Sequence, residues 1–356
     1  MAERVRLAIL GPGDVAQRDY LPEFERIADR AEIVAVCGRT EHRARALAEQ
    51  HGASWFTDQA TMLREVGIDA VLNLTPIQAH AETTAMALEA GVHVYSEKPL
   101  AGSVADGRDL ERLAEERGLV LVAAPCVMRF PQVLLARQLI DAGRIGRVHT
   151  ARGVVMGAVP PWPGFTSDPT PYFSPGAGPL VDLGVYPLHA ITGLVAPVRR
   201  VSAMSARVGT SFTVPDGPAA GTRVDVNVDD TWVTQLDLGE GRLATVEANY
   251  SSHGTHAAEL ELMGTDGTLA LSLLDVAAPI EVLTDGTWTS VEVPRTGRAD
   301  GPDHLVGVEH LLDRLAGDAE PELTPAHAIH VLEIVEQAER SARDGVVASL
   351  ETTIDR

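Results

Sequence analysis

Three side chains that can exchange protons lie close together in the segment VDLGVYPLH, residues 181–189: Asp182, Tyr186 and His189. Their spacings of four and three residues place them on one face if the segment is helical. A carboxylate, a phenol and an imidazole on one face could handle the proton of a substrate hydroxyl. The pattern equally fits a helix whose Tyr and His lie at the edge of a core, so the rest of the chain has to decide.

A glycine-rich turn follows the first predicted strand, residues 5–10. It reads GPGDVA, which is the dinucleotide fingerprint G-x-G-x-x-A placed before a predicted helix. Gly11 permits the tight turn, Gly13 lets the backbone approach a pyrophosphate, and the helix offers its first N–H groups to the negative charge. We therefore predict a dinucleotide bound by Gly11, Gly13, Asp14, Val15 and Ala16.

The end of the second predicted strand bears on the choice of cofactor. An acidic residue there would bind the ribose 2′-hydroxyl of NAD, but the chain has Cys37-Gly38-Arg39-Thr40. No carboxylate repels a 2′-phosphate, and Arg39 is a planar fork donor, so NADP is predicted, with NAD as the alternative. A solvated arginine at a helix start would look the same. The predicted contacts are Gly38, Arg39 and Thr40.

Two further strand ends carry polar residues. The segment Asn73-Leu74-Thr75-Pro76 is followed by His80, and Ser96-Glu97-Lys98-Pro99 ends the next strand. Ligands bind at the carboxyl ends of parallel strands, so Lys98 is expected to face the nicotinamide. Pro99 lacks a backbone donor and fixes the chain direction beside Lys98. The predicted cofactor contacts here are Thr75, Pro76, His80, Glu97 and Lys98.

The strands and helices predict two domains. In residues 1–125, strands alternate with helical segments, which is typical of an α/β doubly wound parallel sheet, the Rossmann fold; the later strands are 32–38, 69–75, 92–97 and 119–124. Residues 126–356 predict an α+β domain for substrate binding and oligomerisation, with a large, mostly antiparallel open sheet. Its strands include 201–208, 229–238, 244–252 and 258–264. Two closing helices, within 303–343, are expected to pack back toward the N-terminal domain.

Composition limits the class of protein. A chain of 356 residues with 45% hydrophobic and 22% charged residues is typical of a globular protein of two domains. Its net charge of −21 disfavours nucleic acid and anionic membranes as partners. The two cysteines, the short N-terminal apolar stretch and the lack of an ~18-residue apolar run predict a cytoplasmic protein. The histidine pairs 253/256 and 327/330 lack further ligands, so no metal is predicted.

These motifs together resemble one family. G-x-G-x-x-A, then T-P with a His four residues after the Pro, then E-K-P, then the D-x-G segment at residue 182, are similar to the Gfo/Idh/MocA family of NAD(P)-dependent oxidoreductases. The resemblance extends to the closing helices and so covers nearly the whole chain. It implies an enzyme that oxidises or reduces a sugar, a polyol or a related small hydroxy or keto compound, and a homodimer or homotetramer formed through the C-terminal sheet.

The resemblance also implies roles for single residues. Lys98 matches the E-K-P lysine that bonds the substrate hydroxyl, Asp182 matches the first residue of D-x-x-x-H, and Tyr186 takes the place of the catalytic His. His189 falls where relatives often have Asp, Asn or Thr. Arg129-Phe130 resembles the end of N-R-R-F, but Val127 replaces the Asn. The implied substrate contacts are Lys98, Arg129, Asp182, Tyr186 and His189. Apart from the resemblance, the aromatic residues of the Pro-rich passage 159–179 suit either one wall of a sugar-sized pocket, with Trp162 and Tyr172 as substrate contacts, or the packing of an irregular loop; they are Trp162, Phe165, Tyr172 and Phe173.

The chemistry of such a site is coherent, but it leaves alternatives open. A Tyr with a pKa of about 10 needs a neighbouring cation such as Lys98 to act as a base near neutral pH. His189 could take the proton instead. A redox-assisted lyase or hydrolase that retains NAD, and a non-catalytic nucleotide-binding sensor, are the alternative functions for this sequence.

Overall fold

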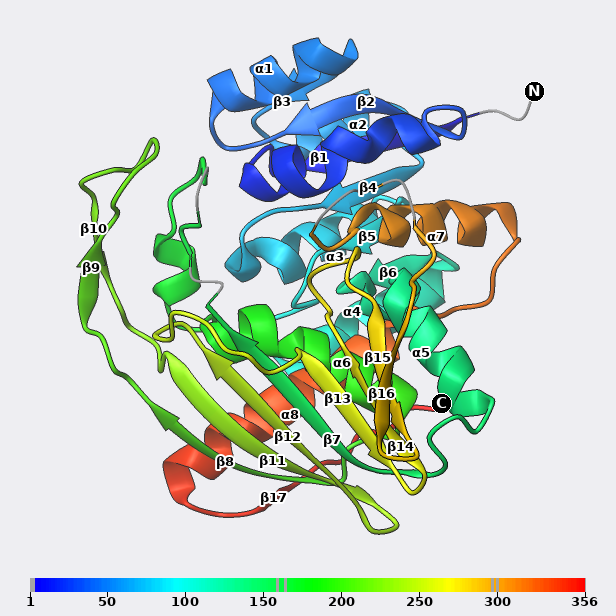
Figure 1. Ribbon diagram of the computed structural model, residues 1–356. Coiled ribbons are helices and arrows are strands. Elements are labelled where there is room, and N and C mark those ends of the chain that lie inside the picture. Colours follow the sequence, from blue (N-terminus) through cyan, green and yellow to red (C-terminus); the bar gives the residue numbers. More distant parts are fainter. Residues whose placement is uncertain (1–3, 158–159, 163–164, 296–297, 299–300, 356) are drawn as a thin grey trace. The chain divides into compact units, whose positions relative to one another are not determined.

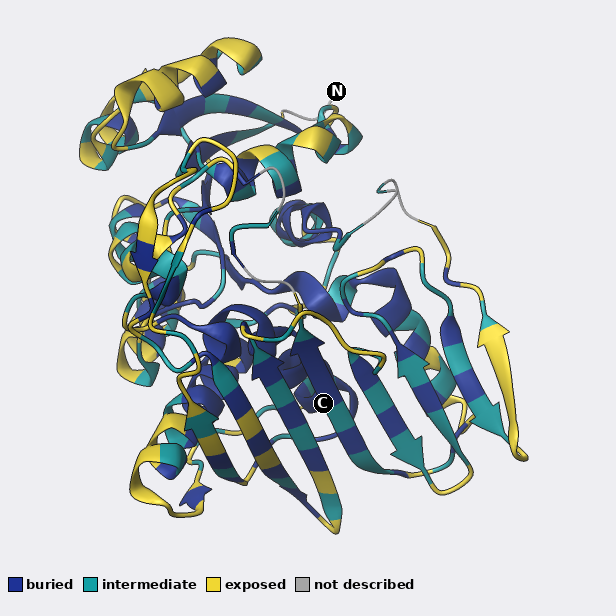
Figure 2. Cartoon of the chain, turned by 60° about the vertical axis from the view of Figure 1, so that its left-hand side comes forward, coloured by how far each residue is buried: buried dark blue, intermediate teal, exposed yellow. Residues whose placement is uncertain are grey.

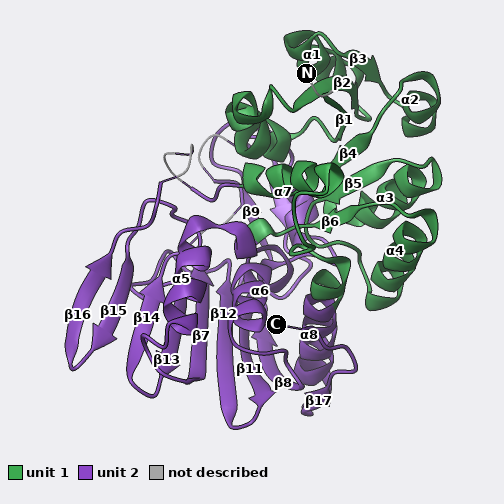
Figure 3. Ribbon diagram, turned by 90° about the vertical axis from the view of Figure 1, so that its right-hand side faces the viewer, with its two compact units in different colours: residues 1–126, 304–329 green, residues 127–303, 330–356 purple. Residues whose placement is uncertain are grey.

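The structure is a computed structural model that describes residues 4–157, 160–162, 165–295, 298 and 301–355. The chain divides into two compact units (Figure 3). Unit 1 comprises residues 1–126 and 304–329, and unit 2 comprises residues 127–303 and 330–356. Both units are therefore discontinuous in sequence, because a segment near the end of the chain belongs to unit 1.

Within the described residues, unit 1 contains a six-stranded parallel sheet in the order β3-β2-β1-β4-β5-β6 (Figure 1). The strands are β1 (Val5–Leu10), β2 (Ala31–Cys37), β3 (Ser54–Phe56), β4 (Ala70–Asn73), β5 (His93–Ser96) and β6 (Leu121–Ala123). The strand order reverses between β1 and β4, and ligands bind at such a switch point in doubly wound sheets. The predicted Rossmann fold is confirmed, with β3 as an additional short edge strand.

Most helices of unit 1 connect these strands, and the last one comes from the later segment of the chain. They are α1 (Glu41–His51), α2 (Gln59–Glu65), α3 (His80–Glu89), α4 (Val104–Arg117) and α7 (Leu305–Ala316). The hydroxyl of Ser103 accepts a hydrogen bond from the N–H of Asp106 and begins α4, and Gly118 ends it in the left-handed conformation. Leu110 and Ala114, four residues apart, are buried by this helix.

The segment after the glycine-rich turn differs from the regular helix that the sequence predicts. A π-helical turn (η1, Ala16–Tyr20) leads into a 3₁₀-helix (η2, Leu21–Ile27). Pro22 lies in the first turn of η2. Because proline has no N–H to donate and its ring clashes with the preceding turn, an unbroken α-helix cannot pass through this position.

Residues from the end of the chain complete unit 1. The N–H of Ala123 in β6 donates to the carbonyl of Leu323 at 3.1 Å. Gly307 of α7 packs so closely on Tyr95 that a Cβ there would lie 2.6 Å from the phenol oxygen. Two ion pairs join η2 and the turn after it to α7: Arg26–Glu309 at 2.8 Å and Arg30–Asp313 at 2.7 Å.

As far as the structure describes it, the main sheet of unit 2 has nine strands, in the order β16-β15-β14-β13-β7-β12-β11-β8-β17. They are β7 (Val148–Met156), β8 (Arg200–Ala206), β11 (Thr231–Gly239), β12 (Arg242–Asn249), β13 (Leu260–Gly264), β14 (Gly267–Leu271), β15 (Ile280–Thr284), β16 (Thr287–Val291) and β17 (Ala348–Ser349). Only β7 and β12 pair in parallel among these strands. The predicted large, mostly antiparallel sheet is confirmed. A separate hairpin pairs β9 (Ser211–Thr213) with β10 (Arg223–Asp225).

One face of this sheet is covered by helices and the other is not. The helices are α5 (Pro131–Asp141), α6 (Val185–Leu194) and α8 (Pro325–Asp344), whose first five residues belong to unit 1. Helix α6 packs directly on β7: a Cβ on Gly153 would lie 2.4 Å from Cβ of Pro187. Figure 2 shows buried and more exposed residues alternating along the strands, as expected for a sheet with one open face.

None of the described helices is both long enough and apolar enough to cross a bilayer.

Candidate active site

The glycine-rich turn after β1 forms a backbone cradle that a side chain would fill. Gly11 has a φ of +88°, its N–H donates to the carbonyl of Cys37 at 2.9 Å, and a Cβ would lie 2.4 Å from the carbonyl oxygen of Leu74. Gly38 packs against the turn, because a Cβ there would lie 2.4 Å from the ring of Pro12. The conformation and the space both require glycine, which fits close approach of a dinucleotide pyrophosphate.

The rest of the fingerprint lies in the segment that leads into η1. Ala16 is fully buried, as the close packing of helix on strand requires. Asp14 is buried and forms an ion pair with Arg18 at 3.1 Å, and Val15 is half-buried.

The end of β2 presents an exposed cation. Arg39 and Thr40 are both exposed, and Thr40 is the N-cap residue of α1. Its side chain makes no capping hydrogen bond, so the hydroxyl is not used by the helix. An arginine and a hydroxyl beside a helix N-terminus are suited to binding a phosphate group.

The ends of β4 and β5 are joined by a hydrogen-bonded network. The hydroxyl of Thr75 donates to Oδ1 of Asn73 at 2.7 Å, and the amide group of Asn73 donates to the hydroxyl of Thr84 at 2.9 Å. The ring of His80 is buried and both of its nitrogens lie 2.7 Å from backbone carbonyl oxygens, Nδ1 from Pro99 and Nε2 from Thr75. His80 thus uses its ring on the backbone of two predicted cofactor-binding segments.

Glu97 fixes the backbone of Lys98. The N–H of Lys98 donates to Oε2 of Glu97 at 2.9 Å, and the hydroxyl of Tyr20 donates to Oε1. The phenol oxygens of Tyr20 and Tyr95 are 3.0 Å apart, and burial raises the pKa of both. Lys98 itself is half-buried. It is the only lysine of the chain, which has 28 arginines.

Pairing in the sheet brings the unit 1 residues together. Leu10 at the end of β1 pairs with both Cys37 and Asn73, and Asn73 pairs with Ser96. The segments that follow β1, β2, β4 and β5 therefore leave the sheet along one edge, as the sequence predicts.

In unit 2, Asp182 is bonded to a residue that the sequence did not single out. Asp182 lies in a π-helical turn (η6, Leu180–Gly184) that leads into α6, and only 3% of it is exposed. The hydroxyl of Tyr250, just beyond β12, donates to Oδ2 of Asp182 at 2.7 Å. Burial and the charge of Asp182 raise the pKa of Tyr250, which keeps this hydroxyl protonated. The only local signal for Tyr250 was its position near the end of the predicted strand 244–252.

Tyr186 and His189 lie on α6, and both are buried. Nδ1 of His189 lies 2.8 Å from the carbonyl oxygen of Val185, so the neutral ring carries its hydrogen on Nδ1 and leaves Nε2 as an acceptor. Burial lowers the pKa of His189 to about 4. His189 is therefore neutral at physiological pH.

The aromatic residues of the Pro-rich passage form two groups. The rings of Trp162, Phe165 and Tyr172 contact one another with centroids 5.0–6.0 Å apart. Phe173 instead lies 5.4 Å from the ring of Tyr250, beside the Asp182 contact. Residues 159, 163 and 164 of this passage lie outside the described residues. Arg129 is half-buried and ends a 3₁₀ turn (η4, Cys126–Arg129).

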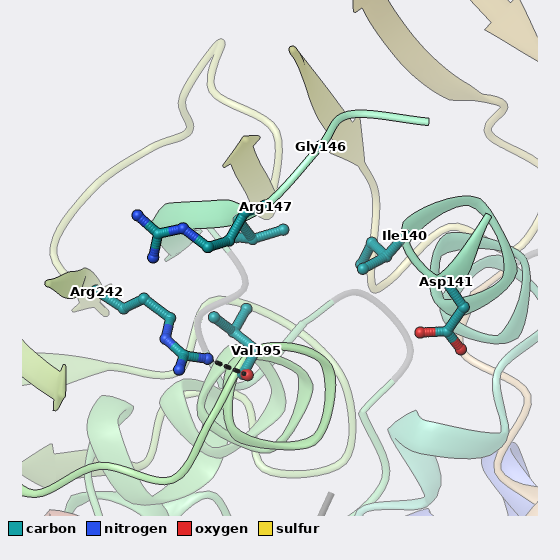
Figure 4. A pocket seen from close by; sticks show the side chains of 7 residues that line it. Ile140, Asp141, Gly146, Arg147, Val195 and Arg242 are labelled. Carbon is teal, nitrogen blue, oxygen red and sulfur yellow. Dashed lines mark hydrogen bonds between the residues drawn. The ribbon is translucent and has the colours of Figure 1, made fainter. Parts of the chain in front are cut away.

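A pocket of about 200 Å³ lies at the end of the unit 2 sheet that is opposite to the Asp182–Tyr250 contact (Figure 4). It is at the start of β7 and β12 and the end of α6, whereas Tyr250 follows the end of β12 and Asp182 precedes α6. Arg242 there donates to the carbonyl of Val195 at 3.4 Å. None of the predicted site residues is among its described lining residues. The lining is formed by Ile140, Asp141, Gly146, Arg147, Val148, Val195 and Arg242. No group of three or more His, Cys, Asp or Glu among the described residues is arranged to hold a metal ion.

Comparison with known families gives two matches that together span most of the chain. Residues 5–124 match the Gfo/Idh/MocA model described as an oxidoreductase family with an NAD-binding Rossmann fold. Residues 133–270 match the Gfo/Idh/MocA C-terminal domain.

Similar proteins act on sugars. A dTDP-3,4-didehydro-2,6-dideoxy-α-D-glucose 3-reductase of Streptomyces violaceoruber is 33% identical over 276 residues, covering 74% of this chain and 79% of that protein. A D-glucoside 3-dehydrogenase of Escherichia coli is 29% identical over 325 residues, covering 88% of each chain. Among solved structures, a levoglucosan dehydrogenase in complex with NADH and L-sorbose has a TM-score of 0.86 at 20% identity, covering 98% of this chain and 99% of that one.

Proposed function

Because the chain belongs to the Gfo/Idh/MocA family of NAD(P)-dependent oxidoreductases, as its motifs indicated, we propose that it transfers hydride at a secondary carbinol of a sugar ring. The observation that carries this proposal is Lys98. It lies two residues beyond the end of β5, in the E-K-P motif, and is the single lysine among 29 basic residues. All other basic residues of the chain are arginines, so arginine is the residue it uses where a solvated positive charge is sufficient. A lysine at this place therefore indicates that a compact ammonium group is needed.

The ring position follows from the relatives. The 3-reductase and the 3-dehydrogenase both act at carbon 3 of a hexose, in opposite directions by name. We therefore take carbon 3 of a pyranose as the reacting centre. A polyol such as an inositol has the same secondary hydroxyl pattern and is the second substrate class, because a scyllo-inositol 2-dehydrogenase of Bacillus subtilis is 24% identical over 98% of each chain.

The side chains have separate roles in binding the substrate and in transferring its proton. When bound, the nicotinamide supplies the hydride acceptor or donor. Lys98 steadies negative charge on the reacting oxygen, and the hydroxyl of Tyr186 exchanges the proton. Asp182, held by Tyr250, binds a substrate hydroxyl. His189 is held neutral by burial and serves as an acceptor at Nε2 rather than as the main base, since its pKa of about 4 makes it a weak one.

NADP is the proposed cofactor, with NAD as the alternative. The exposed Arg39 and the uncapped hydroxyl of Thr40 support binding of a 2′-phosphate, and the sequence after β2 has no carboxylate to repel it. NADH is the cofactor named in the solved levoglucosan dehydrogenase complex.

We also propose that two copies associate through the open face of the unit 2 sheet. Met204 and Val233 are opposite each other on β8 and β11 and are 80% and 46% exposed, and Leu243 of β12 is 59% exposed. Near them, Arg152 of β7 lies between Glu247 and Glu261 at 3.6 and 3.5 Å. An apolar strip beside a cluster in which an arginine partly offsets two carboxylates is suited to burial against a second copy.

The function is tested by absorbance at 340 nm with hexosides, 3-keto hexosides and inositols, each with NADP(H) and NAD(H). We expect net turnover on a pyranose and loss of at least a hundredfold in kcat for Lys98→Met. Arg108→Met, at another basic residue of unit 1, is the control and should keep wild-type rates. Product formation without net change at 340 nm would instead indicate the redox-assisted lyase or hydrolase. Full activity of Lys98→Met would refute the assigned role.

A further inference from the structure

Both ring nitrogens of His80 face groups that can only accept hydrogen bonds. Nδ1 lies 2.7 Å from the carbonyl oxygen of Pro99, and Nε2 lies 2.7 Å from that of Thr75. A neutral imidazole has one N–H and one bare lone pair. A neutral ring could therefore make only one of these hydrogen bonds, and in the other a lone pair would face a carbonyl oxygen at 2.7 Å.

Glu97 provides a charge of the opposite sign next to this ring. Its carboxylate is buried, and the two groups that donate to it, the hydroxyl of Tyr20 and the N–H of Lys98, are both neutral. A buried carboxylate is costly unless a cation is near. His80 lies within range of its charge and meets that need.

The electrostatic balance at His80 has opposing parts. The pKa of His80 is lowered overall, because burial, the largest effect, and the charge of Lys98 outweigh the hydrogen bonds to Pro99 and Thr75 and the charge of Glu97, which raise it. Glu97 and Lys98 are its charged neighbours in unit 1, and Asn73 and Thr84 of the adjoining network are neutral. Two short contacts to obligate acceptors are the geometric observation that decides between the protonation states.

We propose that His80 is a buried imidazolium held in the field of the Glu97 carboxylate, and that these two residues together position Lys98. Glu97 binds the N–H of Lys98, and His80 binds the carbonyl of Pro99, the next residue. The backbone is thus held on both sides of the lysine. His80 is a positioning residue, because its ring nitrogens are taken up by backbone carbonyls rather than by a ligand.

The same ring joins the two strand-end segments. Through Thr75 it holds the segment after β4, and through Pro99 it holds the segment after β5. Asn73 also holds the backbone of His80 in place, since its amide group donates to the backbone carbonyl of His80 at 3.1 Å. Loss of one proton from the ring would release one of the two segments, and the direction of the Lys98 side chain would no longer be fixed.

The protonation state is tested without substrate or cofactor. In the full chain labelled with ¹⁵N-histidine, we expect one ring with two protonated nitrogens at pH 7.5, absent from His80→Gln. His93 is an internal reference, because its Nδ1 accepts from the N–H of Val120 at 2.9 Å and its ring must be neutral. A neutral His80 ring overturns the proposal. If His80→Gln does not fold, Glu97→Gln serves instead, since removal of the countercharge should convert that ring to the neutral form.

The positioning of Lys98 has its own readout, because a chain with one lysine gives one lysine side-chain signal. In protein labelled with ¹³C,¹⁵N-lysine, we expect the Cε–Nζ resonance to shift or broaden in His80→Gln and to stay unchanged in the control His93→Gln. An unchanged signal in both variants overturns the positioning role. This result does not depend on which substrate the enzyme uses.

The kinetic consequence rests on the proposed function of Lys98. His80→Gln should lower kcat on the order of ten- to a hundredfold, as a misplaced catalytic group does, while the Kd for NADPH or NADH rises by a clearly smaller factor. A weaker Kd with unchanged kcat would make His80 a cofactor-binding residue instead. Failure to find any substrate would count against the proposed function and leave both NMR results standing.

Discussion

The hydroxyl of Tyr250 donates a 2.7 Å hydrogen bond to Oδ2 of Asp182, so a residue just beyond β12 fixes the carboxylate in the turn before α6. Both side chains are buried. The orientation of Asp182 is thus set by the sheet as well as by its own helix. A buried carboxylate that loses a donor is destabilised by about 1–3 kcal/mol.

Tyr250→Phe should therefore lower the free energy of unfolding by that amount and raise KM for the sugar about tenfold. Urea unfolding and steady-state kinetics measure the two effects. Phe173→Leu is the matched control, because it disturbs the ring packed 5.4 Å from Tyr250 but leaves the hydrogen bond. Loss of stability with an unchanged KM in Tyr250→Phe would show that Asp182 has only a structural role.

Arg39→Ala should separate the two cofactors. Loss of a charge-assisted hydrogen bond to a 2′-phosphate reduces kcat/KM for NADPH about ten- to a hundredfold, whereas NADH has no such group and should change less than twofold. Arg45→Ala is the control, because Arg45, on the helix α1 that follows Arg39, is already paired with Glu41 and stacked on Trp55. Equal losses for both cofactors would contradict a 2′-phosphate contact.

Two buried histidines of unit 2 should make the protein sensitive to acid. Burial lowers the pKa of His189 and of His330 to about 4 in the folded state, against 6.5 when exposed. The unfolded chain therefore binds more protons between these values, and stability falls as pH falls from 6.5 toward 4, by about 3 kcal/mol for each ring.

This loss can be assigned to single rings. Nε2 of His330 accepts from the N–H of Val198 at 3.0 Å, so protonation also removes that hydrogen bond. His330→Gln cannot titrate, and its urea-unfolding free energy should depend less steeply on pH between 6.5 and 4 than that of the wild type. Parallel curves for the two proteins would exclude His330 as a source of the acid sensitivity.

Met204→Glu should weaken self-association. The side chain is 80% exposed on the open sheet face, so the change costs the isolated chain little but places a charge in the proposed interface. Sedimentation velocity should show a shift from a dimer or tetramer toward the monomer. Val347→Glu, at an exposed residue just before β17, is the control. An unchanged assembly in Met204→Glu would place the interface elsewhere or leave the chain monomeric.

The parts of the site that depend on local sequence were predictable. Gly11 directly follows one buried strand and Lys98 lies just beyond the end of another, so the parallel-sheet rule was enough to place both at the same edge. Tyr250 was not predictable in this way, because it is 68 residues from Asp182 and their contact depends on how β12 and η6 pack. Spacing patterns along the sequence predict contacts within one element and cannot predict such a long-range contact.

Two local elements could not be predicted from the hydrophobic and spacing patterns of the sequence. β3 is a three-residue edge strand, too short for an alternating pattern to stand out. Asp182 lies in a π-helical turn and not in the regular helix that the spacing of residues 182, 186 and 189 suggests. A single extra residue in a turn changes which side chains share a face, and composition does not reveal it.

The joining of residues 304–329 to unit 1 has a consequence for biosynthesis. β6 receives its partner at Leu323, and Tyr95 its cover at Gly307, only after residues 127–303 have been translated. Until then residues 1–126 have an uncovered aromatic residue and an unpaired strand edge, which are features that favour aggregation of a nascent chain. The dinucleotide-binding unit is thus begun before unit 2 and is completed only when residues 304–329 have been made.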